Sequence, residues 1–240
     1  MKVRFLSAGD GALVVEFGDR IERALSNDVL RLDASLRSGG LPGVVETVPT
    51  FRSLMVHYDP VATTCADLVR AITSLLDRQP GPRAAATLWR VPVCYEGSFA
   101  PDLGEVANRT GLAPSEVVAL HSGTPYHVYM RGFLPGFPYM GDQPHELALP
   151  RRADPRLHVP AGSVSIATTL TAIYPYQSPG GWHLIGATPI RFFDADRAPP
   201  ALLAAGDQAS FEPIDAASFA ALSEAISSGG YQIDSEPIPP

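Results

Sequence analysis

The stretch from Arg131 to Asp142, RGFLPGFPYMGD, restricts the fold of this chain more than any other. Pro135 and Pro138 each remove a backbone amide donor and clash with the preceding turn of a helix, so the stretch cannot be helical. It is too rich in aromatic residues for a solvated linker, and its glycines let backbone approach a neighbour closely. We therefore expect a rigid, partly buried loop, the kind of segment that often carries a binding site.

Two further segments of the same character follow, residues 151–167 (RRADPRLHVPAGSVSIA) and residues 177–183 (QSPGGWH). Any one of the three, taken alone, is typical of an ordinary barrel corner. Three in close succession favour a single site, because rigid loops on one scaffold are where sites are usually built. We predict that these corners meet in space, so that Phe137, Arg156 and Gly180 share one hollow or contact surface.

Four motifs in this region carry a family resemblance: residues 132–141 (GFLPGFPYMG), 150–167 (PR-x3-PR-x-x-VPAGSVSIA), 171–189 (TAIYPYQSPGGWHLIGATP) and 191–194 (RFFD). In this order they resemble the B-subunit family of bacterial 5-oxoprolinase. That family is also known as allophanate hydrolase subunit 1, and it includes the sporulation kinase inhibitor KipI. It is similar to one half of the carboxyltransferase domain of urea carboxylase. The resemblance covers nearly the whole chain.

The charge and the lysine content exclude several classes of function. A net charge of −7 argues against a nucleic-acid partner or an anionic membrane surface. Lys2 is the only lysine, which excludes a buried catalytic lysine, a P-loop lysine and a biotin-bearing lysine in this chain. The N-terminus carries no long apolar run, so we expect no signal peptide and a cytoplasmic protein. Cys65 and Cys94 are expected to be free thiols.

We expect an α+β fold, with a small N-terminal α+β sandwich over residues 1–82 and a cyclophilin-like β-barrel over residues 83–240. The break is predicted at residues 79–87, where Pro80 and Pro82 flank Gly81. Apolar periodicity predicts the helices, with Val29, Leu32 and Leu36 on one face of the first, and Thr64 with Asp67 three residues on predicts a capped start for the second. Short alternating runs predict the strands. For the first domain we expect strands at 3–6, 12–17, 44–49 and 54–58, and helices at 21–36 and 66–78.

For the second domain, regular short strands between Gly/Pro corners predict a closed or nearly closed barrel, and the resemblance implies a cyclophilin-like one. The strand at residues 88–95 is expected to pair with the sheet edge of the first domain, and the tail from Glu236 to be frayed. A helical hairpin at residues 102–122 resembles a helix-turn-helix, but its three acids disfavour DNA. The remaining predicted elements are strands at 126–130, 147–149, 163–167, 171–174, 182–186, 190–193 and 209–214, and a helix at 215–226.

Most catalytic templates fail on this sequence. Gly136 and Gly141 have P-loop spacing, but acid and amide side chains follow where lysine and Ser/Thr are required. No pair of histidines has i, i+4 spacing, so we expect no metal site. Neither Ser163 nor Ser178 lies in the G-x-S-x-G elbow that exposes a nucleophile, and the alternative for both is hydrogen bonding within a turn.

The candidate site is therefore one of recognition, with proton transfer from groups that titrate near neutrality. Backbone amides of the 178–181 segment are predicted to form an anion-binding nest, and arginines of the 151–156 segment to hold a carboxylate. The alternatives are core histidines, surface ion pairs and aromatic contacts with another subunit. Our candidates for catalysis are His127, His183 and Ser178, and for substrate binding Arg131, Phe137, Tyr139, Arg156, Ser163, Gly180, Gly181 and Trp182.

The resemblance implies one subunit of an ATP-dependent amidohydrolase that opens 5-oxoproline to glutamate. It implies two partners, a C-type barrel protein (KipA or allophanate hydrolase subunit 2) and an A-type protein. ATP is expected to be used by the complex, since this chain has no recognisable ATP loop, and the chain alone is expected to be inactive. Two alternatives remain open: a carboxyltransferase half working with a biotin carrier, and a KipI-like inhibitor of a histidine kinase.

Overall fold

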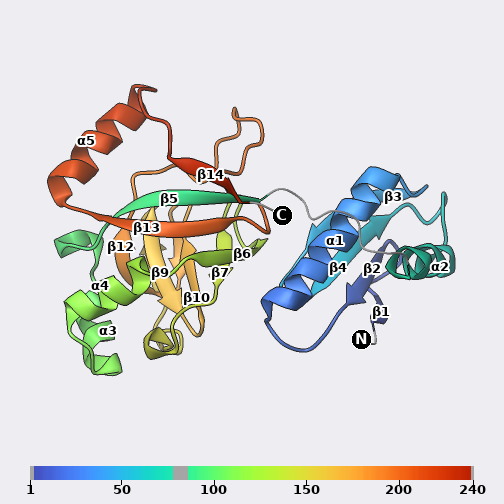
Figure 1. The fold of residues 1–240 in the computed structure, drawn as a ribbon, viewed down its shortest axis with the longest axis horizontal. Coiled ribbons are helices and arrows are strands. Elements are labelled where there is room, and N and C mark those ends of the chain that lie inside the picture. Colours follow the sequence, from blue (N-terminus) through green and yellow to red (C-terminus); the bar gives the residue numbers. More distant parts are fainter. Residues whose placement is uncertain (1–2, 78–85, 239–240) are drawn as a thin grey trace. The chain divides into compact units, whose positions relative to one another are not determined.

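The computed structural model describes residues 3–77 and 86–238, which belong to two compact units. The boundary predicted between residues 82 and 83 lies outside the described residues. Each unit is built around a hydrophobic core of its own. Figure 1 shows the strands and helices of both units.

The first unit is a four-stranded antiparallel sheet, in the order β1-β2-β4-β3, with two helices. The strands bury alternate residues, as in β4, where Leu54, Val56 and Tyr58 face the core. Val29, Leu32 and Leu36 of the first helix pack into the same core, so the predicted α+β sandwich is confirmed. Its elements are β1 (Arg4–Ser7), β2 (Ala12–Glu16), α1 (Arg23–Gly39), β3 (Val44–Pro49), β4 (Ser53–Tyr58) and α2 (Cys65–Leu76).

The capping residue predicted for the second helix is confirmed. The amide of Asp67 donates to the Thr64 hydroxyl at 3.2 Å, and that hydroxyl donates to the Asp67 carboxylate at 2.6 Å. This reciprocal pair satisfies one free amide of the first turn. The first helix ends at Gly40, which adopts the left-handed conformation and donates its amide to Leu36.

The second unit is built on a closed ring of seven strands, in the order β12-β9-β10-β7-β6-β13-β5 (Figure 1). Pairing of Ala187 with Cys94 closes the ring between β12 and β5, so the closed form of the predicted barrel is confirmed. The ring strands are β5 (Ala86–Cys94), β6 (Tyr126–Arg131), β7 (Pro138–Gly141), β9 (Ser163–Ala167), β10 (Leu170–Ile173), β12 (His183–Ala187) and β13 (Gln208–Ile214).

The remaining elements of this unit lie between or beside the ring strands. The helices α3 and α4 form the predicted helical hairpin, and Val106 and Val117 join them to the barrel core. They are α3 (Leu103–Thr110), α4 (Pro114–Ser122), α5 (Ala216–Ser227), the short 3-10 helices η1 (Gly97–Phe99) and η2 (His145–Leu147), the paired strands β8 (Arg156–Val159) and β11 (Ser178–Gly180), and the outer strand β14 (Ser235–Ile238).

Two predictions about strand pairing at the ends of this unit are wrong. Strand β5 does not extend the first unit's sheet; it pairs in parallel with β13 and antiparallel with β14. Of the tail predicted to be frayed, residues 236–238 lie in β14, with Glu236 opposite Leu88 and Ile238 opposite Ala86, and the rest lies outside the described residues. Pro237 is tolerated there because β14 is an edge strand, where a missing amide donor costs no ladder bond.

Three further assignments differ from the sequence-based ones. Part of the predicted rigid loop is the barrel strand β7, which Pro138 begins without breaking the ladder inside it. Residues 190–193, predicted as a strand, make only an isolated bridge between Phe193 and Ala201. Residues 147–149 were also predicted as a strand, but Leu147 ends the 3-10 helix η2 and only Leu149 is bridged, to Thr168.

Candidate functional site

The paired strands β8 and β11 bring the three predicted corners together. Arg156 and Gly180 are cross-strand partners in this pair. Gly180 lies so close to Tyr174 that a Cβ atom placed there would be 2.3 Å from the tyrosine hydroxyl. The ring of Phe137 lies 5.1 Å from the ring of Tyr174, edge to face. The structure therefore brings Phe137, Arg156 and Gly180 into one neighbourhood, and none of the three lines either hollow described below.

Three of the predicted substrate-binding residues, Phe137, Tyr139 and Trp182, form one aromatic wall. The ring centroids of Phe137 and Tyr139 are 5.0 Å apart, and that of Trp182 is 6.0 Å from Tyr139 and 6.2 Å from Phe137. The guanidinium of Arg151 lies 5.8 Å from the centre of the Trp182 ring, within cation–π range. The rings of Phe137 and Trp182 are buried, so the accessible part of this wall is the half-buried Tyr139 with the exposed Arg151 beside it.

The phenols beside this wall stay protonated at neutral pH. Burial raises the pKa of Tyr139, and the nearby Arg151 guanidinium offsets part of that rise. Burial likewise raises the pKa of Tyr174 to about 12, against the smaller opposing effect of the Trp182 backbone hydrogen bond. Neither phenol is therefore a base near pH 7, and each acts only as a neutral hydrogen-bonding group.

A buried carboxylate, Asp102, organises the arginines next to the wall. Only 3% of Asp102 is exposed, and its oxygens accept from Arg156 Nη1 at 2.9 Å and Arg156 Nη2 at 2.5 Å. They also accept from Arg152 Nη1 at 3.3 Å and from the Leu184 amide at 2.7 Å. Both terminal nitrogens of Arg156, which we predicted to bind substrate, are thus engaged by a protein carboxylate.

His183 lies in the same ionic group, together with Glu105 and Arg109. Its Nε2 is 3.0 Å from the Pro150 carbonyl, and because a carbonyl only accepts, Nε2 must carry a proton. Its Nδ1 therefore faces the Glu105 carboxylate, 3.9 Å away. Glu105 also accepts from Arg152 Nη1 at 2.9 Å. His183 is fully buried, and its bond to the Pro150 carbonyl ties strand β12 to the segment that precedes Arg151.

The other predicted catalytic residues do not join this group. His127 lies on β6, which is not a neighbour of β12 in the barrel, and its buried ring packs 4.6 Å from that of Tyr129. The Ser178 hydroxyl donates to the Pro179 carbonyl at 3.3 Å, within strand β11 rather than within a turn. The two predicted histidines therefore do not form one proton-transfer pair.

The predicted anion-binding nest is wrong. Ser178 and Gly180 lie in the extended strand β11 and face Val159 and Arg156 of β8. A nest needs alternating left- and right-handed residues, whereas these residues are extended. Gly181 leaves the strand, and its carbonyl accepts from the Arg152 amide at 2.8 Å.

Two predicted substrate-binding residues lie at the edges of the site. Ser163 begins β9 and is nearly buried, and its carbonyl accepts from the Tyr174 amide at 3.0 Å. Arg131 ends β6 and is exposed. Ser163 therefore contributes backbone to the corner, whereas the Arg131 side chain faces solvent.

Sequence reasoning missed Asp102 and Glu105 as members of the site. It used both acids only as an argument against DNA binding. Their i, i+3 spacing at the start of a helix was the available signal, because it places two carboxylates on one helix face. Which basic residues they meet depends on the fold, since Arg152 and Arg156 lie far along the chain.

A second buried polar chain lies in the barrel core around His121. The Thr171 hydroxyl donates to the Ser165 carbonyl, so it must accept from His121 Nε2 at 2.9 Å. His121 Nδ1 then accepts from the Tyr95 hydroxyl at 2.8 Å. Burial lowers the pKa of His121 to about 3, so this imidazole is neutral near pH 7. Both of its ring nitrogens have partners, so His121 is a satisfied core residue.

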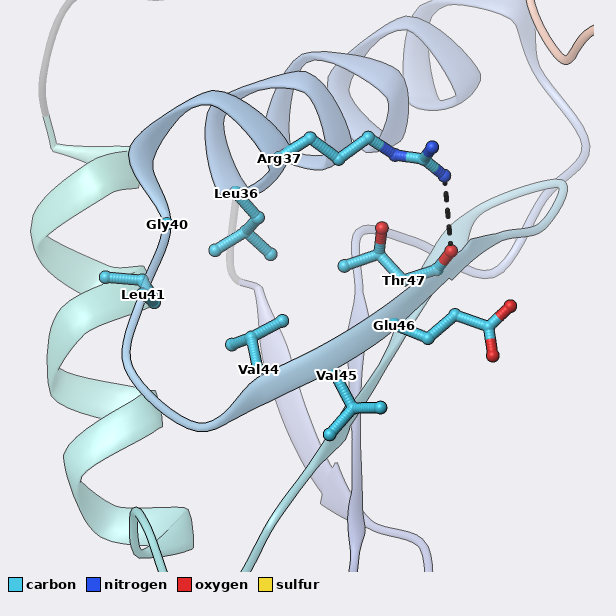
Figure 2. A pocket seen from close by; sticks show the side chains of 8 residues that line it. All are labelled: Leu36, Arg37, Gly40, Leu41, Val44, Val45, Glu46 and Thr47. Atoms are coloured by element: carbon cyan, nitrogen blue, oxygen red, sulfur yellow. Dashed lines mark hydrogen bonds between the residues drawn. The ribbon is translucent and has the colours of Figure 1, made fainter.

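Two hollows in the described structure lie away from these residues. One, of about 360 Å³, lies between the end of α1 and β3 in the first unit, where Arg37 donates to the Thr47 carbonyl at 3.4 Å (Figure 2). The other, of about 400 Å³, is lined by Trp89, Arg191 and Tyr231 among others in the second unit. No predicted site residue lines either one.

The segment from Gly136 to Gly141, which has P-loop spacing, does not fit the phosphates of a nucleoside triphosphate. Most of that segment is strand β7, which pairs with β6 and β10 and so cannot wrap a phosphate. No group of three or more His, Cys, Asp or Glu side chains suited to a metal ion occurs in residues 3–77 and 86–238. Within those residues, no helix is both long and apolar enough to cross a bilayer.

Comparison with known proteins assigns the family. Residues 3–203 match the carboxyltransferase domain, subdomain C and D. The chain is 37% identical to the 5-oxoprolinase B subunit of Bacillus subtilis, over 90% of this chain and 95% of that protein. The solved structure of TTHA0988 superposes with a TM-score of 0.76 at 34% identity, over 89% of this chain but only 40% of the solved chain.

The urea amidolyase of K. lactis shares the fold, with a TM-score of 0.83 at 20% identity. That match covers 98% of this chain and 16% of the amidolyase. Since a likeness this low in identity shows the fold alone, the family assignment depends on the matches that extend along most of the sequence. Those matches show that this chain belongs to the family of 5-oxoprolinase B subunits, within the carboxyltransferase domain C and D group.

Proposed function

We propose that this chain is the B-type member of a complex that hydrolyses 5-oxoproline to glutamate at the expense of ATP. The observation that carries this proposal is the 37% identity to a 5-oxoprolinase B subunit along 95% of its length. In this proposal the chain is inactive alone and works beside a C-type barrel protein and an A-type protein.

The aromatic wall and Arg151 suit a small cyclic amide that carries a carboxylate. A flat five-membered ring can lie against the half-buried ring of Tyr139, while the exposed Arg151 guanidinium, already placed over Trp182, pairs with the carboxylate. Asp102 and His183 hold the surrounding loops in place. We assign substrate binding to this chain, because neither predicted serine is activated by a neighbouring base.

ATP is assigned to the complex rather than to this chain. Hydrolysis of an unstrained lactam needs an activated carbonyl, and phosphorylation by ATP supplies that activation. The Gly136–Gly141 segment does not fit the phosphates, so nucleotide binding falls to a partner protein in this proposal.

Reconstitution tests the proposal. The chain would be mixed with the C-type and A-type proteins of the same organism, and ADP and glutamate release would be measured with and without 5-oxoproline. We expect 5-oxoproline-dependent release of both products from the full set only. Full activity of this chain alone, or none from the set, would contradict the assignment.

A carboxyltransferase half is the second candidate, favoured by the family description that residues 3–203 match. In that case a carboxylated biotin carrier would deliver its carboxyl group to a urea-like acceptor. Incubating the complex with carboxybiotin and urea, and measuring carboxylated product, separates the two. Product formation without any 5-oxoproline-dependent ADP release would decide for this second candidate.

A further inference from the structure

Phe133, at the tip of the loop between β6 and β7, combines exposure with an unfavourable backbone. Its side chain is 62% exposed, and its φ angle is +69°. This left-handed conformation is rare for a bulky L-residue, whereas glycine adopts it freely. The same loop uses glycine for that purpose at Gly136, where φ is +75°.

The loop holds the Phe133 ring rigidly. The amide of Gly132 donates to the Phe137 carbonyl at 3.2 Å, that of Leu134 to Gly132 at 2.8 Å, and that of Phe137 to Leu134 at 3.1 Å. The Phe133 ring stands edge-on to Phe137, with centroids 5.5 Å apart at 82°. These contacts fix an exposed aromatic ring in one orientation before any partner arrives.

Stability of the isolated fold does not account for this residue. A mostly exposed ring gains little from burial, and the left-handed backbone opposes a side chain with a Cβ atom. Glycine at position 133 would remove the strain. Strained residues of this kind cluster at functional positions, and rigid aromatic anchors are typical centres of protein interfaces.

The surroundings of Phe133 indicate the chemistry of the partner. Gly136 packs against Phe193, whose ring lies 6.0 Å from the partly exposed Tyr176, so apolar surface continues beside the loop. Arg131, at the base of the loop, has no carboxylate partner among residues 3–77 and 86–238, unlike arginines such as Arg90 and Arg109. An apolar socket edged by acidic side chains would complement this surface.

We propose that Phe133 is the anchor by which this chain docks onto the C-type protein, with Arg131 facing an acidic edge of the socket. The choice of partner rests on the proposed function. A protein neighbour is supported by TTHA0988, in which the region similar to this chain makes up 40% of a longer polypeptide. Further polypeptide therefore accompanies this fold in that relative.

The test compares Phe133→Gly, Phe133→Ala and wild type by calorimetric titration with the purified C-type protein. We expect both variants to bind at least about tenfold more weakly, as truncation of an interface anchor does. The midpoint of thermal unfolding of Phe133→Gly should be equal to or above that of wild type, since strain is relieved. Arg131→Glu should weaken binding less at high salt than at low salt.

Val61→Ala serves as the matched control, because Val61 is an apolar residue that is 94% exposed in the first unit. Its affinity should equal that of wild type. Equal affinity of Phe133→Gly and wild type would overturn the docking role, even where the complex still turns over 5-oxoproline. The docking role would also be overturned if wild type does not bind the C-type protein. It would likewise be overturned if the variants lose only self-association.

The same samples separate this inference from the proposed function. Phe133-dependent binding without 5-oxoproline-dependent ADP release would leave the docking surface standing and reject the activity. If 5-oxoproline turnover at limiting concentrations of the two proteins is the same for wild type and the Phe133 variants, the activity stands and the docking role of Phe133 is rejected.

Discussion

The guanidinium of Arg156 donates two hydrogen bonds, at 2.9 Å and 2.5 Å, to the carboxylate of Asp102. Asp102 is the N-cap residue of α3, yet its side chain does not cap that helix. It accepts instead from Arg156 on β8, from Arg152 and from the Leu184 amide on β12. One buried carboxylate thus joins a helix, a loop hairpin and a barrel strand behind the aromatic wall.

Replacing Asp102 by asparagine should therefore destabilise the second unit. The change leaves the partly buried Arg156 without its counter-ion, whereas Arg152 keeps Glu105, and breaking a buried ion pair costs about 3 kcal/mol. Urea unfolding would measure the loss. Asp234→Asn is the control, because Asp234 is 71% exposed in its pair with Arg90 and should contribute less than about 1 kcal/mol. Equal effects of the two variants would show that Asp102 is not the organising group.

The His121 network predicts how stability depends on pH. The pKa of His121 is about 3 in the fold and near its ordinary 6.5 in the unfolded chain, so between these values the unfolded chain binds more protons. This contribution is complete above pH 6.5 and is lost as the pH falls towards 3, at about 1.4 kcal/mol per pH unit.

His121→Gln isolates that contribution, since glutamine can donate to Thr171 and accept from Tyr95 without titrating. Unfolding free energies of wild type and variant would be compared from pH 7 to pH 4. We expect the difference between them to change across this range. A constant difference would mean that His121 does not carry the dependence.

Gly162, in the motif before β9, should not tolerate alanine. Its φ angle is +81°, and a Cβ atom there would lie 2.3 Å from the backbone oxygen of Thr188. We expect Gly162→Ala to cost more than about 2 kcal/mol in urea unfolding. Gly229→Ala is matched in φ, at +75°, but meets no atom within 4 Å, so it should cost only about 1 kcal/mol. Similar losses would refute the steric explanation.

Arg151→Ala should raise the KM of the reconstituted complex for 5-oxoproline at least about tenfold, with a smaller change in kcat. A contact to the substrate carboxylate is present in the ground state and the transition state alike, so its loss appears mainly in KM. Arg191→Ala is the control, because Arg191 is exposed and lines the hollow beside Trp89. A fall in kcat at unchanged KM would contradict the assigned role of Arg151.

Much of the fold could be predicted because its signals are local. The periodicity of Val29, Leu32 and Leu36 predicted α1, and Thr64 with Asp67 predicted the start of α2. The strand predictions were wrong where a proline begins a strand or lies in an edge strand. Pro138 begins β7 and Pro237 lies in β14, and the two stretches were predicted as a loop and a tail. Whether a proline sits at an end or in the middle of a ladder is a property of the pairing.

The site was predictable only in part, for a related reason. Glycine and proline mark rigid loops in a sequence, so the neighbouring residues Phe137, Trp182 and Gly180 could be selected as candidates from the sequence alone. The partners of the arginines were not, because the Asp102–Arg156 pair joins residues that only the tertiary fold brings together. The chemistry of a side chain can be read from the sequence, whereas its spatial neighbours depend on the topology of the fold.

In the second unit, Ala86 of β5 and Ile238 of β14 are cross-strand partners. The first and last described residues of this unit therefore lie side by side on neighbouring strands. A unit with this geometry can be inserted into a longer polypeptide without breaking its ring of strands.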